Sequence, residues 1–319
     1  MAQSRNLSIE LLKFLAVIIV YNSHCELLYG EYSFLATGGA IGDCLFFFVS
    51  GFTLFLGRND RFDNWYKRRI RRIFPSVFSW AIISSFVFNK SISLYKLLSG
   101  GSWFVTCIMI YYIVLYFVRR WAEHKPLVPY IITIAIVIIY YLNEDSSTFF
   151  MYGETYFKWV HYFLFMLLGA YTGNGTIHIV PHFKRDFFLF MVSVFLFYLI
   201  MIGATKNGLI SHFQLLSLIP LLSIIISMYN LCNCHFSNVL MNKKVGNYLT
   251  IVSSMCLEIY IVQVSCMTDI MNNLFPFNIF ILFVFIVIVA YVTRLLGRLL
   301  LQLFQTEDID WKYLVRLRY

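Results

Sequence analysis

The stretch "KFLAVIIVYNSHCELLYG", residues 13–30, decides the class of the fold, because it is apolar enough to cross a membrane and yet carries Lys13 and His24. Apolar stretches of about 17 to 25 residues, the length that spans a bilayer as a helix, recur along the whole chain. The 319 residues are 60% hydrophobic and 13% charged, with a mean hydropathy of +0.74. A soluble domain of this size cannot bury so much apolar surface. We therefore predict an all-α polytopic membrane protein.

The apolar stretches predict a bundle of about ten transmembrane helices, and we expect one transmembrane domain over residues 1–319. The predicted spans are 8–28, 40–57, 73–89, 102–118, 127–142, 156–173, 186–203, 211–230, 249–271 and 277–301. The first span contains charged residues and lacks a cleavage site of small residues, so we expect it to remain as an uncleaved span.

The distribution of basic residues predicts the orientation. With the N-terminus inside, twenty lysines and arginines fall in cytosolic segments, and four (Lys90, Lys96, Lys158 and Lys206) fall in outer segments. Cytosolic loops carry an excess of Lys and Arg, so both termini are predicted to be cytosolic. This rule also accounts for the net charge of +9, and we expect membrane lipids rather than nucleic acid as the surrounding partner.

The cysteines do not predict a metal site. Seven are scattered along the chain without a C-x-x-C pair, and the tightest group is "CNCH", formed by Cys232, Cys234 and His235. No second half with metal-ligand spacing follows it. We expect neither a metal ion nor a framework of disulfides.

The first span carries a polar stripe. Lys13 and His24 are eleven residues apart, which on one helix is an angular offset of about 20° and a separation of about 16 Å along the axis. Glu10 lies on the same side. A polar stripe in a span faces the bundle interior or an aqueous cavity. Catalysis by His24 and simple interhelical hydrogen bonding both fit this pattern.

A second group of charges lies before the third span, in "KRRIRRIFPSVF", where four arginines end a predicted cytosolic loop and a span opens near Pro75. The arginines are Arg68, Arg69, Arg71 and Arg72. Such a cluster serves either as a topology signal and lipid-headgroup anchor or as a site that binds phosphates by bidentate hydrogen bonds.

Three single features complete the candidates. Ser50 interrupts an aromatic run in the second span, where a small residue favours close helix packing or leaves room for a substrate. Glu258 lies in the ninth span and needs a partner, for which Lys13, His24 and the arginine cluster are the candidates. Trp103 opens a span from the outer face, as expected for an interfacial belt.

Three of these groups together resemble the acyltransferase type 3 family of integral membrane O-acyltransferases. The similarity lies in Lys13-x10-His24, in "FFFVSGF" from Phe46 to Phe52, and in Arg69-x-x-Arg72 before Pro75. Softer similarity extends to "SMCLEIYIVQV" at 254–264. The chain departs from the family where Lys13 replaces an arginine, where Gln263 replaces a histidine, and where Asp43 stands one place early.

The resemblance implies a stand-alone enzyme of a bacterial cytoplasmic membrane that moves an acyl group, usually acetyl, from cytosolic acyl-CoA to a hydroxyl of a glycan or lipid-linked sugar. Arg68, Arg69, Arg71 and Arg72 would bind the CoA phosphates. His24 would be the general base or a transient acyl carrier, with support from Lys13, Glu10 and Glu258. Ser50 and Trp103 would line the substrate side.

Two questions remain open at this point. A homo-oligomer is neither required nor excluded by the sequence. A secondary transporter or channel that uses the Lys13, His24 and Glu258 stripe is the alternative function, because such proteins also place ionisable groups within their spans.

Overall fold

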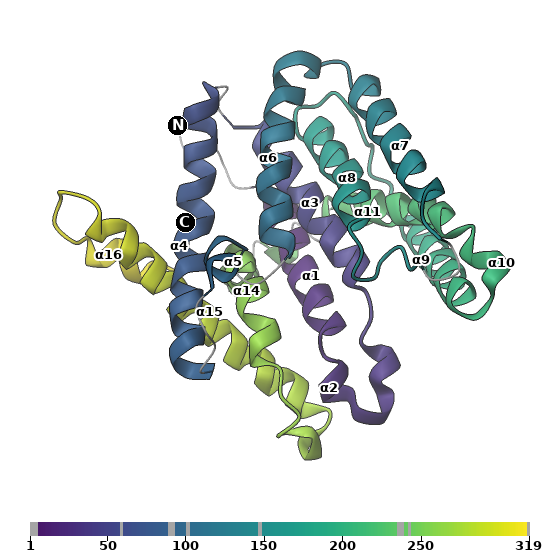
Figure 1. The fold of residues 1–319 in the computed structure, drawn as a ribbon. Helices are drawn as coiled ribbons and strands as arrows, with labels where there is room; N and C mark the ends of the chain where they lie inside the picture. Colours follow the sequence, from purple (N-terminus) through teal and green to yellow (C-terminus); the bar gives the residue numbers. More distant parts are fainter. Residues whose placement is uncertain are drawn as a thin grey trace. The chain divides into compact units, whose positions relative to one another are not determined.

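The computed structural model describes residues 6–57, 60–88, 93–99, 103–145, 149–234, 239–241 and 244–317, and all regular structure within these ranges is helical (Figure 1). The chain folds into two compact units. Unit 1 contains residues 1–12, 40–58 and 115–245, and unit 2 contains residues 13–39, 59–114 and 246–319. Five basic residues used to predict the orientation, and His235 of "CNCH", lie outside the described residues; the five are Arg5, Arg58, Lys90, Lys243 and Arg318.

Each predicted span range contains a helix, although several bounds differ. Unit 1 holds most or all of α3 (Gly39–Phe55), α7 (Leu127–Leu142), α8 (Lys158–Gly173), α9 (Phe183–Lys206), α10 (Gly208–Ser211), η2 (Gln214–Ser217) and α11 (Leu218–Cys232). Unit 2 holds α2 (Glu26–Tyr29), η1 (Gly30–Leu35), α4 (Phe62–Phe88), α5 (Leu94–Ser99), α13 (Lys244–Ser254), α14 (Cys256–Cys266), η3 (Asn272–Leu274), α15 (Phe277–Leu303) and α16 (Trp311–Val315). Helices α1 (Leu7–Ser23) and α6 (Trp103–Ala122) are divided between the units, and α3 and α13 each extend into the other unit by one or two residues.

Several helices can cross a membrane. Among the described residues, five are long and apolar enough, or seven if the bent pairs α1 with α2–η1 and α13 with α14 each form one span. Two shorter apolar helices, α3 and α7, follow. The structure therefore confirms an all-helical chain with several candidate spans, while the count of ten and the cytosolic termini remain predictions.

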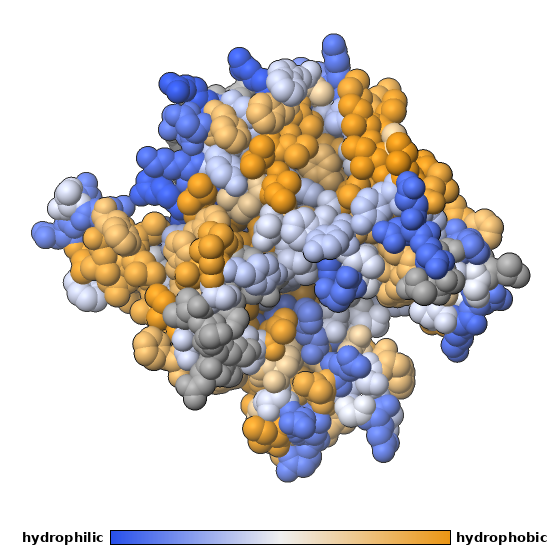
Figure 2. Space-filling view, viewed as in Figure 1, coloured by the Kyte–Doolittle hydropathy of each residue, from blue (hydrophilic) through white to orange (hydrophobic). Residues whose placement is uncertain are grey.

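Apolar side chains cover the outside of these helices, as expected for surface in contact with lipid. On α9 the side chains of Phe188 and Phe195 are each 66% exposed, and on α15 Phe280 is 70% exposed. Hydrophobic residues also cover much of the face seen in Figure 2. A soluble protein rarely exposes apolar patches of this extent.

Helix α8 forms the centre of unit 1, and it touches α3 backbone to backbone. A Cβ atom built on Gly169 would lie 1.8 Å from the carbonyl oxygen of Phe48, and one on Gly51 would lie 2.0 Å from that of Met166. Only glycine permits this approach. Gly51 therefore serves helix packing, and the role of Ser50 beside it stays a prediction.

Helix α4 differs from the predicted third span. The span was expected to open near Pro75, but the helix begins at Phe62 and runs through that proline. The first turns of α4 are charged, and the burial of Trp65, which is 1% exposed, anchors them. The Trp65 indole donates to the carbonyl of Tyr112 at 3.4 Å. Helix α15 packs along α4, and Gly297 lies against the backbone of Pro75. The four arginines therefore lie on a helix, not in a loop.

Candidate active site

The proposed base lies at a break in the first predicted span. Helix α1 is capped by Asn6, whose side-chain oxygen accepts from the backbone N–H of Ser8 at 3.1 Å, and it ends at Ser23. His24 and Cys25 form a turn, after which α2 and η1 leave at 64° to α1. His24 is half-buried. The sequence placed His24 inside a continuous helix, and this expectation is wrong.

Hydrogen bonds of the Asn22 side chain stabilise the break after α1. Its amide donates to the carbonyls of Leu35 at 2.9 Å and Thr37 at 3.0 Å, and its oxygen accepts from the Tyr29 hydroxyl at 2.6 Å. These bonds fold the segment after His24 back onto the end of α1. The hydropathy of the segment contains no sign of this, because the turn depends on side-chain hydrogen bonds.

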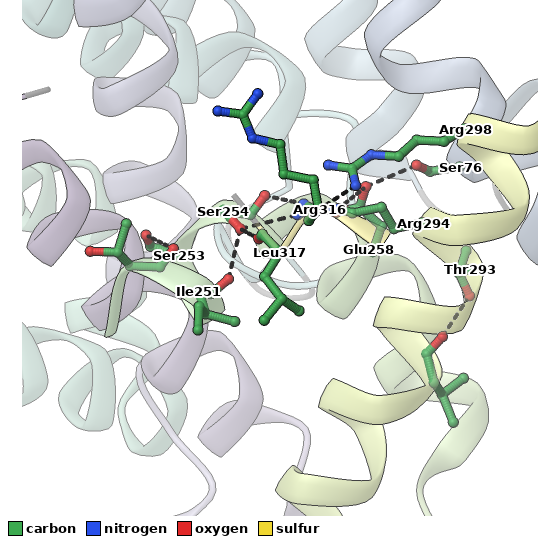
Figure 3. Close-up of polar contacts among 12 residues, drawn as sticks. Ser76, Ile251, Ser253, Ser254, Glu258, Thr293, Arg294, Arg298, Arg316 and Leu317 are labelled. Carbon is green, nitrogen blue, oxygen red and sulfur yellow. Dashed lines mark hydrogen bonds and ion pairs between the residues drawn. The ribbon is translucent and has the colours of Figure 1, made fainter. Parts of the chain in front are cut away.

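Glu258 is 2% exposed and forms an ion pair with Arg294 of α15, at 2.9 Å between Oε2 and an arginine nitrogen (Figure 3). The Ser76 hydroxyl donates to Oε1 at 2.9 Å. Arg294 was not among the partners that the sequence suggested. A buried carboxylate and guanidinium need each other, because either charge alone is costly to bury.

Arg294 also donates hydrogen bonds to the backbone at a second helix break. Helices α13 and α14 meet at Met255 with a bend of 69°. A break leaves backbone carbonyls without their helical donors. Arg294 donates to the carbonyl of Ser254 and, at 3.0 Å, to its hydroxyl. One side chain thus satisfies both the bent backbone and the buried acid.

Basic side chains act electrostatically on Cys256, the first residue of α14. The thiol of Cys256 lies within electrostatic range of Lys13, Arg72, Arg294 and Glu258. Unit 2 therefore brings together three residues that the sequence singled out separately, namely Lys13, Arg72 and Glu258, and adds Arg294. Because Arg294 is paired with Glu258, Lys13 and Arg72 give this group, which we call the cationic cluster, its positive character, and positive charge attracts an anionic ligand.

The other arginines of α4 have different surroundings. Arg68 pairs with Asp60. Arg69 stacks on the ring of Trp65 at 3.6 Å and donates to its carbonyl at 2.9 Å. Arg71 and Arg72 are exposed. Arg69 is thus held by its own helix and Arg68 by Asp60 before it, whereas the side chains of Arg71 and Arg72 are exposed.

The remaining candidates are placed as follows. Glu10 lies in the first turn of α1 and belongs to unit 1, as does the half-buried Ser50 on α3. Trp103 is the first residue of α6, and its neighbour Phe104 packs on Tyr260 of α14 at 4.5 Å between ring centres. Over the ranges that the structure describes, no three His, Cys, Asp or Glu residues form a group that could hold a metal ion.

Arg294 is the main residue that the sequence reasoning missed. It was counted with the cytosolic positive charges, although it lies within the span predicted for 277–301. A useful signal was available, because an arginine and a glutamate that are both inside apolar runs are expected to pair.

The fold and the site define a multi-pass helical membrane protein with a buried Glu258–Arg294 ion pair, beside which the half-buried Lys13 and the exposed Arg72 add positive charge. The family model for the acyltransferase domain of the acyltransferase 3 family matches residues 6–295. The chain therefore belongs to this family, and it is a membrane O-acyltransferase. No curated protein matches the chain significantly, and no solved structure does so either.

Proposed function

We propose that the enzyme transfers an acyl group, most simply acetyl, from cytosolic acyl-CoA to a hydroxyl of a cell-surface or lipid-linked glycan at a bacterial cytoplasmic membrane. The observation that carries this proposal is the cationic cluster of Lys13, Arg72 and Arg294 around Cys256. CoA is a polyanion, and guanidinium groups bind phosphates well. The exposed Arg71 and Arg72, with Arg68 and Arg69 beside them, form the entry for the CoA phosphates.

The separation between the cluster and His24 fits a donor with a long arm. Lys13 and the end of α1 at Ser23 are ten residues apart, which is about 15 Å along the helix. An extended pantetheine arm spans such a distance. With the CoA phosphates near Arg72, the thioester reaches the break that holds His24.

In the proposed reaction His24 accepts the proton of the acceptor hydroxyl as the oxygen attacks the thioester carbonyl. The carbon–sulfur bond then breaks, and the proton passes to the CoA thiolate. Acylated acceptor and free CoA are the products. Lys13 stabilises negative charge on the donor side. Glu258 acts through Arg294, which it holds in place. For Glu10, Ser50 and Trp103 we propose supporting roles from the resemblance alone.

The first test is acyl transfer in proteoliposomes with radiolabelled acetyl-CoA and a crude glycan acceptor. His24→Ala is expected to lower the rate by about a hundredfold or more, the usual effect of losing a general base. Transfer at a rate close to that of the unmodified enzyme would exclude the role of His24.

Donor binding is tested separately by CoA affinity. Arg72→Ala is expected to weaken CoA binding about tenfold, the loss of one charge-assisted contact of about 1.4 kcal/mol. Arg61→Ala is the matched control, because Arg61 is also near the start of α4 but is 85% exposed and pairs with Asp63. Equal losses of CoA affinity in both variants would mean that the arginines act only through the overall charge of the region.

A second function, solute transport, is favoured by one observation. Transporters bind their substrates at broken helices, and unit 2 contains two breaks, at His24–Cys25 and at Met255. The same proteoliposomes distinguish the functions. An acyltransferase requires acyl-CoA for any labelled product, whereas a transporter moves its solute without CoA.

A further inference from the structure

Four aromatic rings form a continuous group beside the break at His24. Tyr32 stacks on Phe275 with 5.8 Å between ring centres, and Tyr29 meets the same ring edge-on at 6.1 Å. Phe34 contacts Tyr32 at 6.4 Å. Phe34 is 74% exposed, Tyr32 51% and Phe275 39%. We call Tyr29, Tyr32, Phe34 and Phe275 the aromatic shelf.

The aromatic shelf is built on the same contacts that shape the break. The Tyr29 hydroxyl is bound to Asn22, two residues before His24. Asn272 donates to the carbonyl of Leu27 at 2.7 Å, and Asn278 donates to that of Leu28 at 2.9 Å. These bonds join η3 and the start of α15 to α2, at the lower end of Figure 1. The exposed rings are thus held in a fixed position near His24.

The charged residues on the two segments that carry the aromatic shelf are acidic, apart from His24. Glu26, Glu31 and Asp269 are exposed. The sequence has no Lys or Arg at positions 24–39 or 267–280. Anionic lipid headgroups are attracted by Lys and Arg, so this surface is a poor headgroup site. Figure 2 shows hydrophilic and hydrophobic surface side by side at the same end.

Rings and carboxylates in this combination fit a sugar. The C–H face of a pyranose ring is apolar and packs on an aromatic ring. Its hydroxyl groups donate hydrogen bonds to carboxylate oxygens. An anionic sugar would be repelled by the three acids, whereas a neutral or amino sugar would not be.

We propose that the aromatic shelf binds the acceptor, and that the acceptor is a neutral or amino-bearing pyranoside within a glycan. This inference rests on the proposed acyl transfer, because it places the acceptor hydroxyl next to His24. Donor and acceptor then approach His24 from opposite ends of α1, the donor from Lys13 and the acceptor from Tyr32. The shelf is a binding surface and takes no part in proton transfer.

The direct test is saturation-transfer-difference NMR on the full chain in detergent, with chitotriose, maltotriose and trigalacturonate as probes. The unmodified enzyme is expected to bind at least one of the first two and not the third. Tyr32→Ala and Phe34→Ala should remove the signal, and Tyr32→Trp should restore it. Phe86→Ala is the matched control, because Phe86 is an exposed ring of α4 at 82%.

A kinetic readout complements the binding test. Loss of one stacked ring removes about 1.4 kcal/mol of binding, so the acceptor KM of Tyr32→Ala should rise about tenfold. The kcat and the affinity for CoA should stay within about twofold. An unchanged thermal midpoint of each variant excludes unfolding as the cause.

The outcomes separate the two proposals. If no neutral sugar binds, or if binding survives in both alanine variants, the shelf is not an acceptor site and its rings are interfacial anchors. If sugar binding depends on Tyr32 but no acyl transfer occurs, the shelf stands and the proposed reaction is wrong. Binding of trigalacturonate alone would overturn the charge argument.

Discussion

Glu258 and Arg294 are opposite charges in apolar surroundings, with side chains that are 3% and 1% exposed. The desolvation cost of such a pair is large, and it is offset only when the remaining hydrogen-bonding groups are also satisfied. Ser76 and Ser254 do this on the two sides of the pair. The pair therefore depends on its whole network, and either residue alone would destabilise unit 2.

Glu258→Gln is expected to lower the free energy of unfolding by about 3 kcal/mol, because it leaves Arg294 buried without a counter-charge. Thermal unfolding in detergent measures this. Replacing both residues by methionine should recover most of the loss, since hydrophobic replacement of a buried ion pair is often neutral. Asp308→Asn, at an exposed acid, is the control. Full stability of the single variant would mean that water solvates the pair.

The sequence identified part of this site for a physical reason. Lys13, Arg72 and Glu258 stand out because charge inside or beside an apolar span is costly and must have a role. Arg294 was not singled out, because it was counted with the basic residues near the C-terminus that the positive-inside rule already explains. Spacing along the chain cannot tell that α15 brings this arginine to Glu258, since that contact joins residues 36 positions apart.

At the scale of helices, the length and apolar content of the sequence stretches predicted where helices lie along the chain, but not where those helices bend. The structure has a helix in each predicted range. The breaks after Ser23 and at Met255 were not predicted, because neither has the Gly or Pro that commonly marks a kink. Arg294 donates to the carbonyl of Ser254 at the second break, and Asn22 at the first break donates to the carbonyls of Leu35 and Thr37, which fold back onto α1. Such breaks are tertiary features that a hydropathy pattern does not record.

The contact between α3 and α8 gives the prediction at this scale. Gly169→Ala is expected to destabilise unit 1 by about 3 kcal/mol, since the new methyl group would overlap the Phe48 carbonyl and the helices would have to separate. Gly208→Ala is the matched control, because nothing lies within 4 Å of a Cβ atom there. The measurement is the thermal midpoint of each variant. Equal midpoints would show that the two helices have room to move apart.

At the scale of the whole molecule, buried arginines weaken the use of basic residues as markers of the cytosolic side. Arg119 donates to the carbonyls of Leu54 and Gly57 at the end of α3. Arg298 binds the carbonyls of Tyr313 and Leu314 and so fixes the C-terminal segment. These side chains are explained by packing whichever way the chain crosses the membrane. The other basic residues of the predicted cytosolic segments still greatly outnumber the four of the predicted outer segments.

The decisive whole-molecule prediction concerns α7. This helix has 16 residues, about 24 Å in length, which is short for a hydrocarbon core of about 30 Å. With ten spans and a cytosolic N-terminus, an epitope inserted after Glu123 is inside and one after Asn143 is outside. Antibody access in intact spheroplasts and after permeabilisation measures this in the full chain, and an epitope at the C-terminus tests the predicted cytosolic side in parallel. If the epitope after Asn143 is also inaccessible until permeabilisation, α7 does not cross, and the bilayer is spanned by fewer helices than the apolar stretches predict.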